Sequence, residues 1–97
     1  MKQELFNILR KIHNDPESTQ RQLASQLGLN IGKLNYSLKA LRSKGLIKIN
    51  NFRKNKKKGK YLYYLTPKGA IEKTKQTINF MKLKMKEYED LKKEIKK

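Results

Sequence analysis

The chain has no cysteine, a single histidine and few acidic residues, and each scarcity excludes a class of function. Without cysteine there is no disulfide, no thiol nucleophile and no cysteine-ligated zinc. His13 has no second histidine with which to form a metal site or a catalytic pair. The sequence also has no phosphate-cradling glycine loop and no nucleophile motif. We therefore expect a protein that is not an enzyme and that uses no metal and no cofactor.

Long hydrophobic runs are also missing. The longest is Tyr61–Leu65, far shorter than a membrane-spanning helix, and the first residues begin an amphipathic pattern rather than a signal peptide. With 97 residues, 36% of them hydrophobic, the chain can build one modest core. We expect a cytoplasmic protein without a membrane partner.

The shortage of acidic residues is concentrated in one part of the chain. The net charge is +17. Residues 1–17 hold three basic and three acidic side chains, and residues 72–97 hold nine basic and five acidic ones. Residues 18–71 hold thirteen basic side chains and no acidic one. A lysine-rich composition that serves solubility explains the excess but explains the acid-free block less well. This block is therefore the expected contact region for a polyanion, with nucleic acid first.

Three helices are expected before residue 45. The first carries an apolar stripe at i, i+3, i+4 and i+7 and ends at 14–16; the stripe is Leu5, Ile8, Leu9 and Ile12. Thr19 and Gln22 form a capping box for the second helix, which ends at Gly28 and buries Leu23, Ala24 and Leu27. Asn30 caps the third helix, 31–44, which ends at Gly45 and buries Ile31, Leu34, Leu38 and Leu41. A short turn containing glycine between two helices is typical of a helix-turn-helix.

After Gly45 the apolar period changes to two. The β-prone runs 46–49 and 61–65 predict a hairpin, and the segment between them, 53–60, holds six cations in eight residues. Thr66 and Pro67 then begin a helix expected to extend over 67–97. The fold class is mainly α with a small β-hairpin: a winged helix-turn-helix with a long C-terminal helix. We expect a DNA-binding domain in 1–66 and a dimerisation coiled coil in 67–97.

Five segments resemble the corresponding segments of small MarR-type winged-helix transcriptional regulators: Gln20–Ala24, Gly32–Tyr36, Leu38–Leu41, Lys44–Ile47 and Leu65–Gly69. The closest resemblance is to the subgroup associated with exopolysaccharide (EPS) gene clusters. It implies a dimeric regulator that binds double-stranded DNA. Full-sized MarR proteins dimerise through extra helices at both ends and often hold a phenolic ligand between them. Because this chain lacks the N-terminal extension, we expect no small-molecule effector.

The third helix carries the residues expected in the major groove, where base edges are distinguishable. Gly32 would let the backbone approach the groove, and Asn35 can pair with adenine through two hydrogen bonds. The candidate contacts are Asn30, Gly32, Lys33, Asn35, Tyr36 and Lys39. The alternative is an ordinary solvated face with Tyr36 half-buried at its margin. Arg42 lies near the far end of the helix, so we expect modest or A·T-leaning discrimination.

Two further segments are candidate backbone contacts. Thr19, Gln20 and Arg21 begin the second helix, whose amides and dipole suit a phosphate, although a plain cap explains Thr19 equally well. On the wing, long basic side chains would hold the DNA backbone or lie along the minor groove; these are Arg53, Lys54, Lys56, Lys57 and Lys58. A flexible, solvated loop tip is the alternative for the wing.

The last helix shows two apolar faces. One fits heptad positions a and d, in the order Ile71, Thr74, Ile78, Met81, Met85, Tyr88, Lys92 and Ile95. Phe80 and Leu83 project from the other side and are expected to dock near Phe6. The expected dimer contacts are Ile78, Met81, Met85, Tyr88 and Ile95. In a parallel pair Lys84 can meet Glu89 of the other chain, but antiparallel pairing and a single broad intramolecular face both stay open.

These observations predict a homodimeric, sequence-specific DNA-binding regulator of transcription. The main alternative is a sequence-nonspecific module that binds DNA or RNA through charge alone. A scaffold that interacts through its long helix is a third hypothesis, which the net charge of +17 disfavours.

Overall fold

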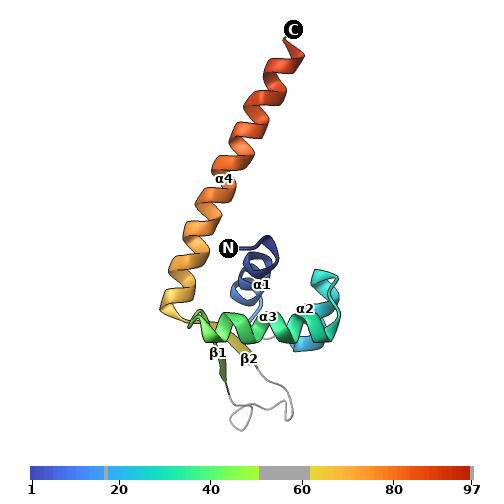
Figure 1. The fold of residues 1–97 in the computed structure, drawn as a ribbon, viewed down its shortest axis with the longest axis vertical. Coiled ribbons are helices and arrows are strands. Elements are labelled where there is room, and N and C mark those ends of the chain that lie inside the picture. The colour runs from blue at the N-terminus through green and yellow to red at the C-terminus, as the bar shows by residue number, and fades with distance from the viewer. Residues whose placement is uncertain (17, 51–61, 97) are drawn as a thin grey trace.

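The computed structural model describes residues 1–16, 18–50 and 62–96. Among these residues the elements follow in the order α1 (Gln3–Asn14), α2 (Gln20–Leu27), α3 (Ile31–Ser43), β1 (Ile47–Asn50), β2 (Leu62–Leu65) and α4 (Pro67–Ile95). The strands form an antiparallel hairpin in which Ile47 faces Leu65 and Asn50 faces Leu62. The predicted fold class is confirmed: a mostly helical chain with one small hairpin and a long last helix (Figure 1).

The predicted helix ends are confirmed at the helix-turn-helix. The Thr19 hydroxyl accepts a hydrogen bond from the Gln22 amide at 3.1 Å, and the Gln22 side chain accepts one from the Thr19 amide at 2.8 Å. Gly28 has a φ of 67°, the left-handed conformation that favours glycine at the end of a helix. The Asn30 side chain accepts from the Lys33 amide at 2.7 Å and caps α3.

The core lies where α1, α2, α3 and the hairpin meet. Its fully buried side chains are Ile8, Leu9, Ile12, Leu23, Leu34, Leu38 and Leu41. The prediction that Ile31 belongs to this core is wrong, since its side chain is 47% exposed. The buried stripe of α3 is turned toward Ser37, which is buried and donates a hydrogen bond to Glu4 of α1. Ile31, the first residue of α3, therefore falls at the edge of the stripe.

The beginning of α4 is joined tightly to the end of α3. The Thr66 hydroxyl donates to the Gly45 carbonyl at 2.6 Å and accepts from the Gly69 amide at 2.9 Å, and the Thr66 amide donates to the Leu46 carbonyl. A methyl group at Gly69 would overlap that same Leu46 carbonyl oxygen. The junction fixes the direction in which α4 leaves the rest of the molecule.

A second contact fixes α4 more than three turns after its first residue. The rings of Phe6 in α1 and Phe80 in α4 lie 6.1 Å apart between centroids, inclined at 50°. The expected docking near Phe6 is thus confirmed for Phe80. Leu83 is 55% exposed and lines a small groove between α1 and α4 together with Phe6 and Phe80. The predicted helix over 67–97 ends slightly earlier, at Ile95.

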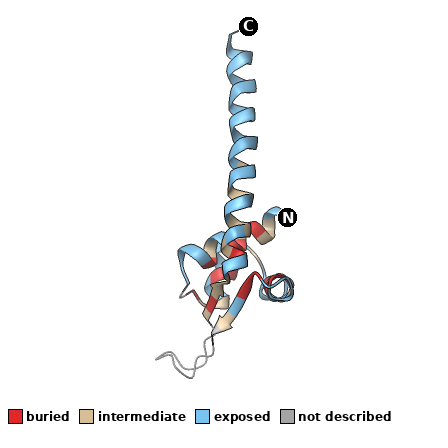
Figure 2. Cartoon of the chain, turned by 90° about the vertical axis from the view of Figure 1, so that its left-hand side faces the viewer, coloured by how far each residue is buried: buried red, intermediate tan, exposed pale blue. Residues whose placement is uncertain are grey.

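The molecule is elongated because α4 extends past the other elements. Its extents are 61 × 26 × 22 Å, and residues 81–96 of the last helix are exposed (Figure 2). The hairpin points away from the C-terminal end of α4, and the C-terminal end of α3 lies next to the base of that helix (Figure 1). Within the described residues, no helix is long and apolar enough to cross a membrane.

Candidate nucleic-acid interface

The outward face of α3 is open to solvent. Tyr36 is 78% exposed, so the alternative in which this ring is half-buried at the margin of the helix is wrong. The other exposed residues of the candidate set on this helix and its cap are Asn30, Gly32, Lys33, Asn35 and Lys39. A large ring in water and several polar side chains form a surface with room for a partner.

Helical spacing divides this surface into two sides. Asn35, Lys39 and Arg42 stand at i, i+4 and i+7 and share one side, and all three are exposed. Lys33, Tyr36 and Ala40 lie on the other side, facing a groove of about 740 Å³ between α3 and the beginning of α1. Arg42 was not among the predicted contacts because it lies near the far end of α3, but helical spacing puts it on the same side as Asn35.

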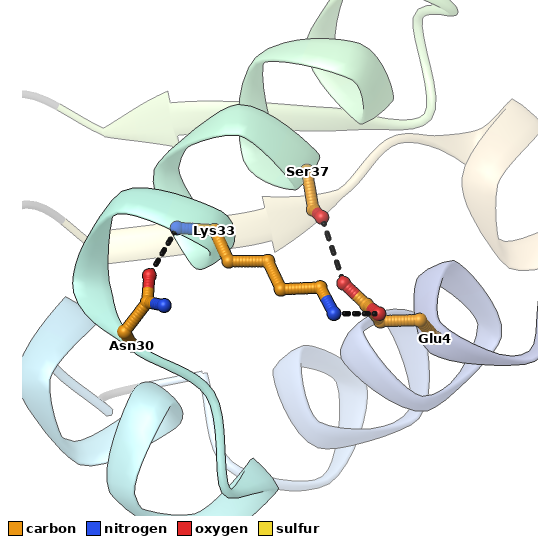
Figure 3. A network of polar contacts seen from close by, with 4 residues as sticks. All are labelled: Glu4, Asn30, Lys33 and Ser37. Carbon is orange, nitrogen blue, oxygen red and sulfur yellow. Dashed lines mark hydrogen bonds and ion pairs between the residues drawn. The ribbon is translucent and has the colours of Figure 1, made fainter.

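Glu4 of α1 lies against α3 and organises the groove side. Its carboxylate is 3.3 Å from the Lys33 ammonium, and its other oxygen accepts from the Ser37 hydroxyl at 3.3 Å (Figure 3). The same close-up shows the Lys33 amide held by Asn30 (Figure 3). Lys33 therefore lies toward α1, and part of its charge is compensated.

No sequence pattern indicates the pair of Glu4 and Lys33. Glu4 stands in a segment of balanced charge, and it is 29 positions from Lys33, so no helical or strand spacing relates the two. Only the packing of α1 against α3 brings them together. Glu4 is thus a residue of the candidate interface that sequence reasoning missed.

The beginning of α2 lies next to the helix-turn-helix turn. Thr19 serves as the cap, as predicted, and is partly buried together with Gln20, whereas Arg21 is exposed. Contact between these residues and a phosphate stays a prediction. The wing residues Arg53, Lys54, Lys56, Lys57 and Lys58 lie outside the described residues.

Metal-ligating side chains are not grouped together in the part of the chain that the structure describes. It contains no group of three or more His, Cys, Asp or Glu side chains that could hold a metal ion. His13 is exposed at the end of α1.

The order of elements identifies the architecture. Helices α2 and α3, joined by a left-handed glycine, are followed directly by a hairpin that packs on the same core. The chain has a winged helix-turn-helix fold. A family profile described as winged helix-turn-helix DNA-binding matches residues 5–48. No curated protein matches the chain.

Solved structures support this winged helix-turn-helix fold over most of the chain. FabT of Streptococcus pneumoniae, solved in complex with DNA, has 21% identity and a TM-score of 0.73, covering 93% of this chain and 61% of FabT. MarR of Staphylococcus aureus, solved in complex with salicylate and kanamycin, has 24% identity and a TM-score of 0.73, and the match covers 88% of this chain and 55% of that MarR protein. ZitR of Lactococcus lactis, a zinc-responsive MarR family member, has 24% identity and a TM-score of 0.73, and the match covers 94% of this chain and 60% of ZitR.

The chain spans between 55% and 61% of the length of these three proteins. At such identities the likeness shows the fold. Of these three proteins, MarR was solved with small molecules bound and ZitR responds to zinc, so the comparisons do not support the expected absence of an effector.

Proposed function

We propose that this winged helix-turn-helix protein is a MarR-type transcriptional regulator that binds double-stranded DNA as a homodimer in the cytoplasm. The observation that carries the proposal is the exposed face of α3, which lies within a stretch of chain, residues 18–71, that has no acidic residue. A phosphate backbone attracts such a surface at long range. The closer likeness to the exopolysaccharide-associated subgroup is part of the same proposal.

In this proposal α3 enters the major groove. The exposed amide of Asn35 offers a donor and an acceptor that match the N6 and N7 edge of adenine. Lys39 and Arg42, on the same side of the helix, contact phosphates or bases next to that adenine. Gly32 has no side chain, so the backbone at the beginning of the helix can approach the groove closely. The amide of one base-reading residue discriminates few base pairs, so a single domain has limited specificity.

Two more segments hold the DNA backbone in the proposal. Thr19, Gln20 and Arg21 lie at the positive end of the α2 dipole, where a phosphate is stabilised. The basic segment 53–60 contacts the DNA backbone or the minor groove through its long cationic side chains. These contacts position the protein and do not read bases.

Dimerisation supplies the missing specificity. Five apolar residues of α4 are between 47% and 84% exposed, namely Ile78, Met81, Met85, Tyr88 and Ile95. An apolar stripe of this length on a helix in water favours a partner helix. Two chains present two copies of α3 to half-sites about one helical turn apart.

The double substitution Asn35→Ala and Lys39→Ala tests the role of α3. Both side chains are exposed and alanine favours a helix, so the fold should be retained. Fluorescence anisotropy with a selected duplex should show an affinity loss of roughly 30-fold or more, since each base or charged contact contributes about 1–3 kcal/mol. The matched control Lys75→Ala removes an exposed cation from α4 and should change the affinity by less than about two-fold.

Unchanged binding by the double variant would contradict the proposal. It would mean that α3 reads nothing and that charge alone holds the DNA, as in a nonspecific nucleic-acid-binding module. Competition separates the two functions further. A regulator retains its preferred duplex against excess random DNA, whereas a nonspecific module does not.

A further inference from the structure

Ile31, the first residue of α3, is open to solvent at a position where the apolar spacing predicts burial. It is 47% exposed, whereas Leu34, the next residue of the same apolar pattern, is fully buried. The apolar side chains that pack on the core from its margin are Leu5, Leu27, Leu29, Ile49 and Leu65. Within the described residues Ile31 is not one of this group. The fold therefore leaves much of this apolar side chain open to a partner.

Helical spacing places Ile31 next to Asn35. The two residues stand at i and i+4, so their Cβ atoms are about 5–6 Å apart on the helix surface. Asn35, Lys39 and Arg42 form the side of α3 on which the proposed function places the DNA, and Ile31 extends this side by one turn toward the beginning of the helix. The first residues of the second helix in a helix-turn-helix contact base edges. Ile31 therefore lies at the end of α3 that should enter the groove.

The neighbouring side chains leave the surroundings of Ile31 clear. Gly32 has no side chain, and the side chain of Asn30 is engaged as the helix cap, where it accepts from the Lys33 amide at 2.7 Å. The Lys33 ammonium is directed toward α1 by the Glu4 carboxylate, 3.3 Å away (Figure 3). A base edge that approaches the beginning of α3 thus meets the apolar side chain of Ile31 without a long cationic side chain in between.

We propose that Ile31 contacts the 5-methyl group of a thymine in the major groove, about one or two base pairs from the adenine that Asn35 binds. The inference rests on the proposed function, because it requires α3 in the major groove of a duplex. The thymine methyl is the apolar group that base edges display in this groove, and apolar side chains recognise it by contact. The distance is suitable, since about 5–6 Å between neighbouring helix positions corresponds to one or two steps of about 3.4 Å along the duplex.

The chemistry of isoleucine favours the methyl group over a phosphate as the partner. The side chain has neither a charge nor a hydrogen-bond donor, so it gains nothing from a phosphate oxygen. Covering one methyl group of thymine should strengthen binding about four-fold. Uracil lacks this group, so the same contact favours DNA over RNA. Ile31 and Asn35 together would recognise two neighbouring A·T base pairs, each through a different chemical group.

Replacing the thymines of the selected duplex one at a time by 2′-deoxyuridine removes only the methyl group and tests this contact. Anisotropy with the full chain should show a loss of about four-fold at one position in each half-site. Ile31→Ala should weaken binding to the thymine duplex by a similar factor and lose nothing further at that position, because the two changes remove the same contact. Ile31→Val keeps both branches at Cβ and should retain the discrimination.

Leu91→Ala is the matched control for the loss of an exposed apolar side chain. Leu91 is 59% exposed on α4, far from α3, so this variant should keep the full effect of uracil. The slope of log affinity on log salt should be the same for Ile31→Ala as for the unchanged chain, because an apolar contact releases no counterions. Thermal melting checks that Ile31→Ala is folded.

The outcomes separate this inference from the proposed function. A position at which uracil weakens binding of the unchanged chain but not of Ile31→Ala supports the contact. Uracil without effect at every position, in a duplex still preferred over random DNA, overturns the contact and leaves the regulator in place. An equal effect of uracil in Ile31→Ala assigns the methyl group to another residue and also overturns it. If no duplex is preferred over random DNA, the proposed function and this inference both fail.

Discussion

At the scale of single residues, the ion pair with Glu4 restrains the position of the Lys33 ammonium group. The Glu4 carboxylate holds the Lys33 ammonium at 3.3 Å and also accepts from Ser37, so α1 restrains one side of the proposed reading helix. Any phosphate contact by Lys33 has to compete with this pair. An acidic group beside a DNA-binding surface also repels the backbone.

The substitution Glu4→Gln should therefore tighten duplex binding. It frees Lys33 and removes one negative charge, and for a partly exposed pair we expect a gain of about two- to five-fold. The slope of log affinity on log salt should become steeper by about 0.9 if Lys33 then contacts a phosphate. Asp90→Asn makes the same change of charge at the far end of α4 and should leave both values unchanged. Weaker binding by Glu4→Gln would show that Glu4 positions α3 instead of restraining Lys33.

Gly32 offers a test in which stability and binding move in opposite directions. A methyl group there would meet only the Asn30 side chain, at the ordinary contact distance of 3.5 Å, so the fold has space for Gly32→Ala. Alanine should raise helix stability by up to about 1 kcal/mol. If the helix backbone approaches the groove closely at this point, affinity should nevertheless fall by about ten-fold. Thermal melting and anisotropy on the same sample check both values, and an unchanged affinity would contradict the close approach.

Residue roles that depend on local sequence were predictable, whereas those that depend on packing were not. The caps at Thr19, Asn30 and Thr66 involve partners three residues away, and all three are present. The ion pair between Glu4 and Lys33 joins two helices, and no sequence pattern predicts it. Ile31 was misplaced because its spacing suits the stripe, but Ser37 takes part in the core through its hydrogen bond to α1.

At the scale of elements, the junction between α3, the hairpin and α4 depends on a glycine. Gly69 is buried against the Leu46 backbone, where a Cβ atom has no space. Gly69→Ala should destabilise the fold by about 2 kcal/mol, as overpacking typically does, and lower Tm by roughly 10 °C. Gly32→Ala is the matched control, since it is the same change near the start of another helix with open space. Equal melting temperatures for the two variants would contradict the tight junction.

The helices and strands themselves were largely predictable because capping residues, glycine and proline mark their ends clearly. Asn14–Pro16, Gly28, Gly45 and Thr66–Pro67 mark the boundaries, and the helices and strands begin or end within one or two residues of them. The direction of α4 was not predictable, because it follows from the Gly69 junction and from the contact of Phe80 with Phe6. Two faces on α4 were expected, and the structure assigns the Phe80 face to the domain.

At the scale of the whole molecule, the charge of +17 should make binding strongly dependent on salt. If each subunit neutralises roughly four phosphates, the slope of log affinity on log salt for the dimer should be about −7. Anisotropy titrations between about 50 and 200 mM salt measure this slope. A slope near −1 would contradict an interface spread over α3, the beginning of α2 and the basic segment 53–60.

The central claim is that two copies of this fold read DNA sequence through α3. Selection of bound duplexes from a random pool tests it most directly, with the full chain at near-physiological salt. The account predicts an enriched two-fold symmetric sequence, A·T-leaning, with half-sites centred about one helical turn apart. Recovery of duplexes without any enriched sequence would contradict it and would identify the protein as a nonspecific nucleic-acid-binding module.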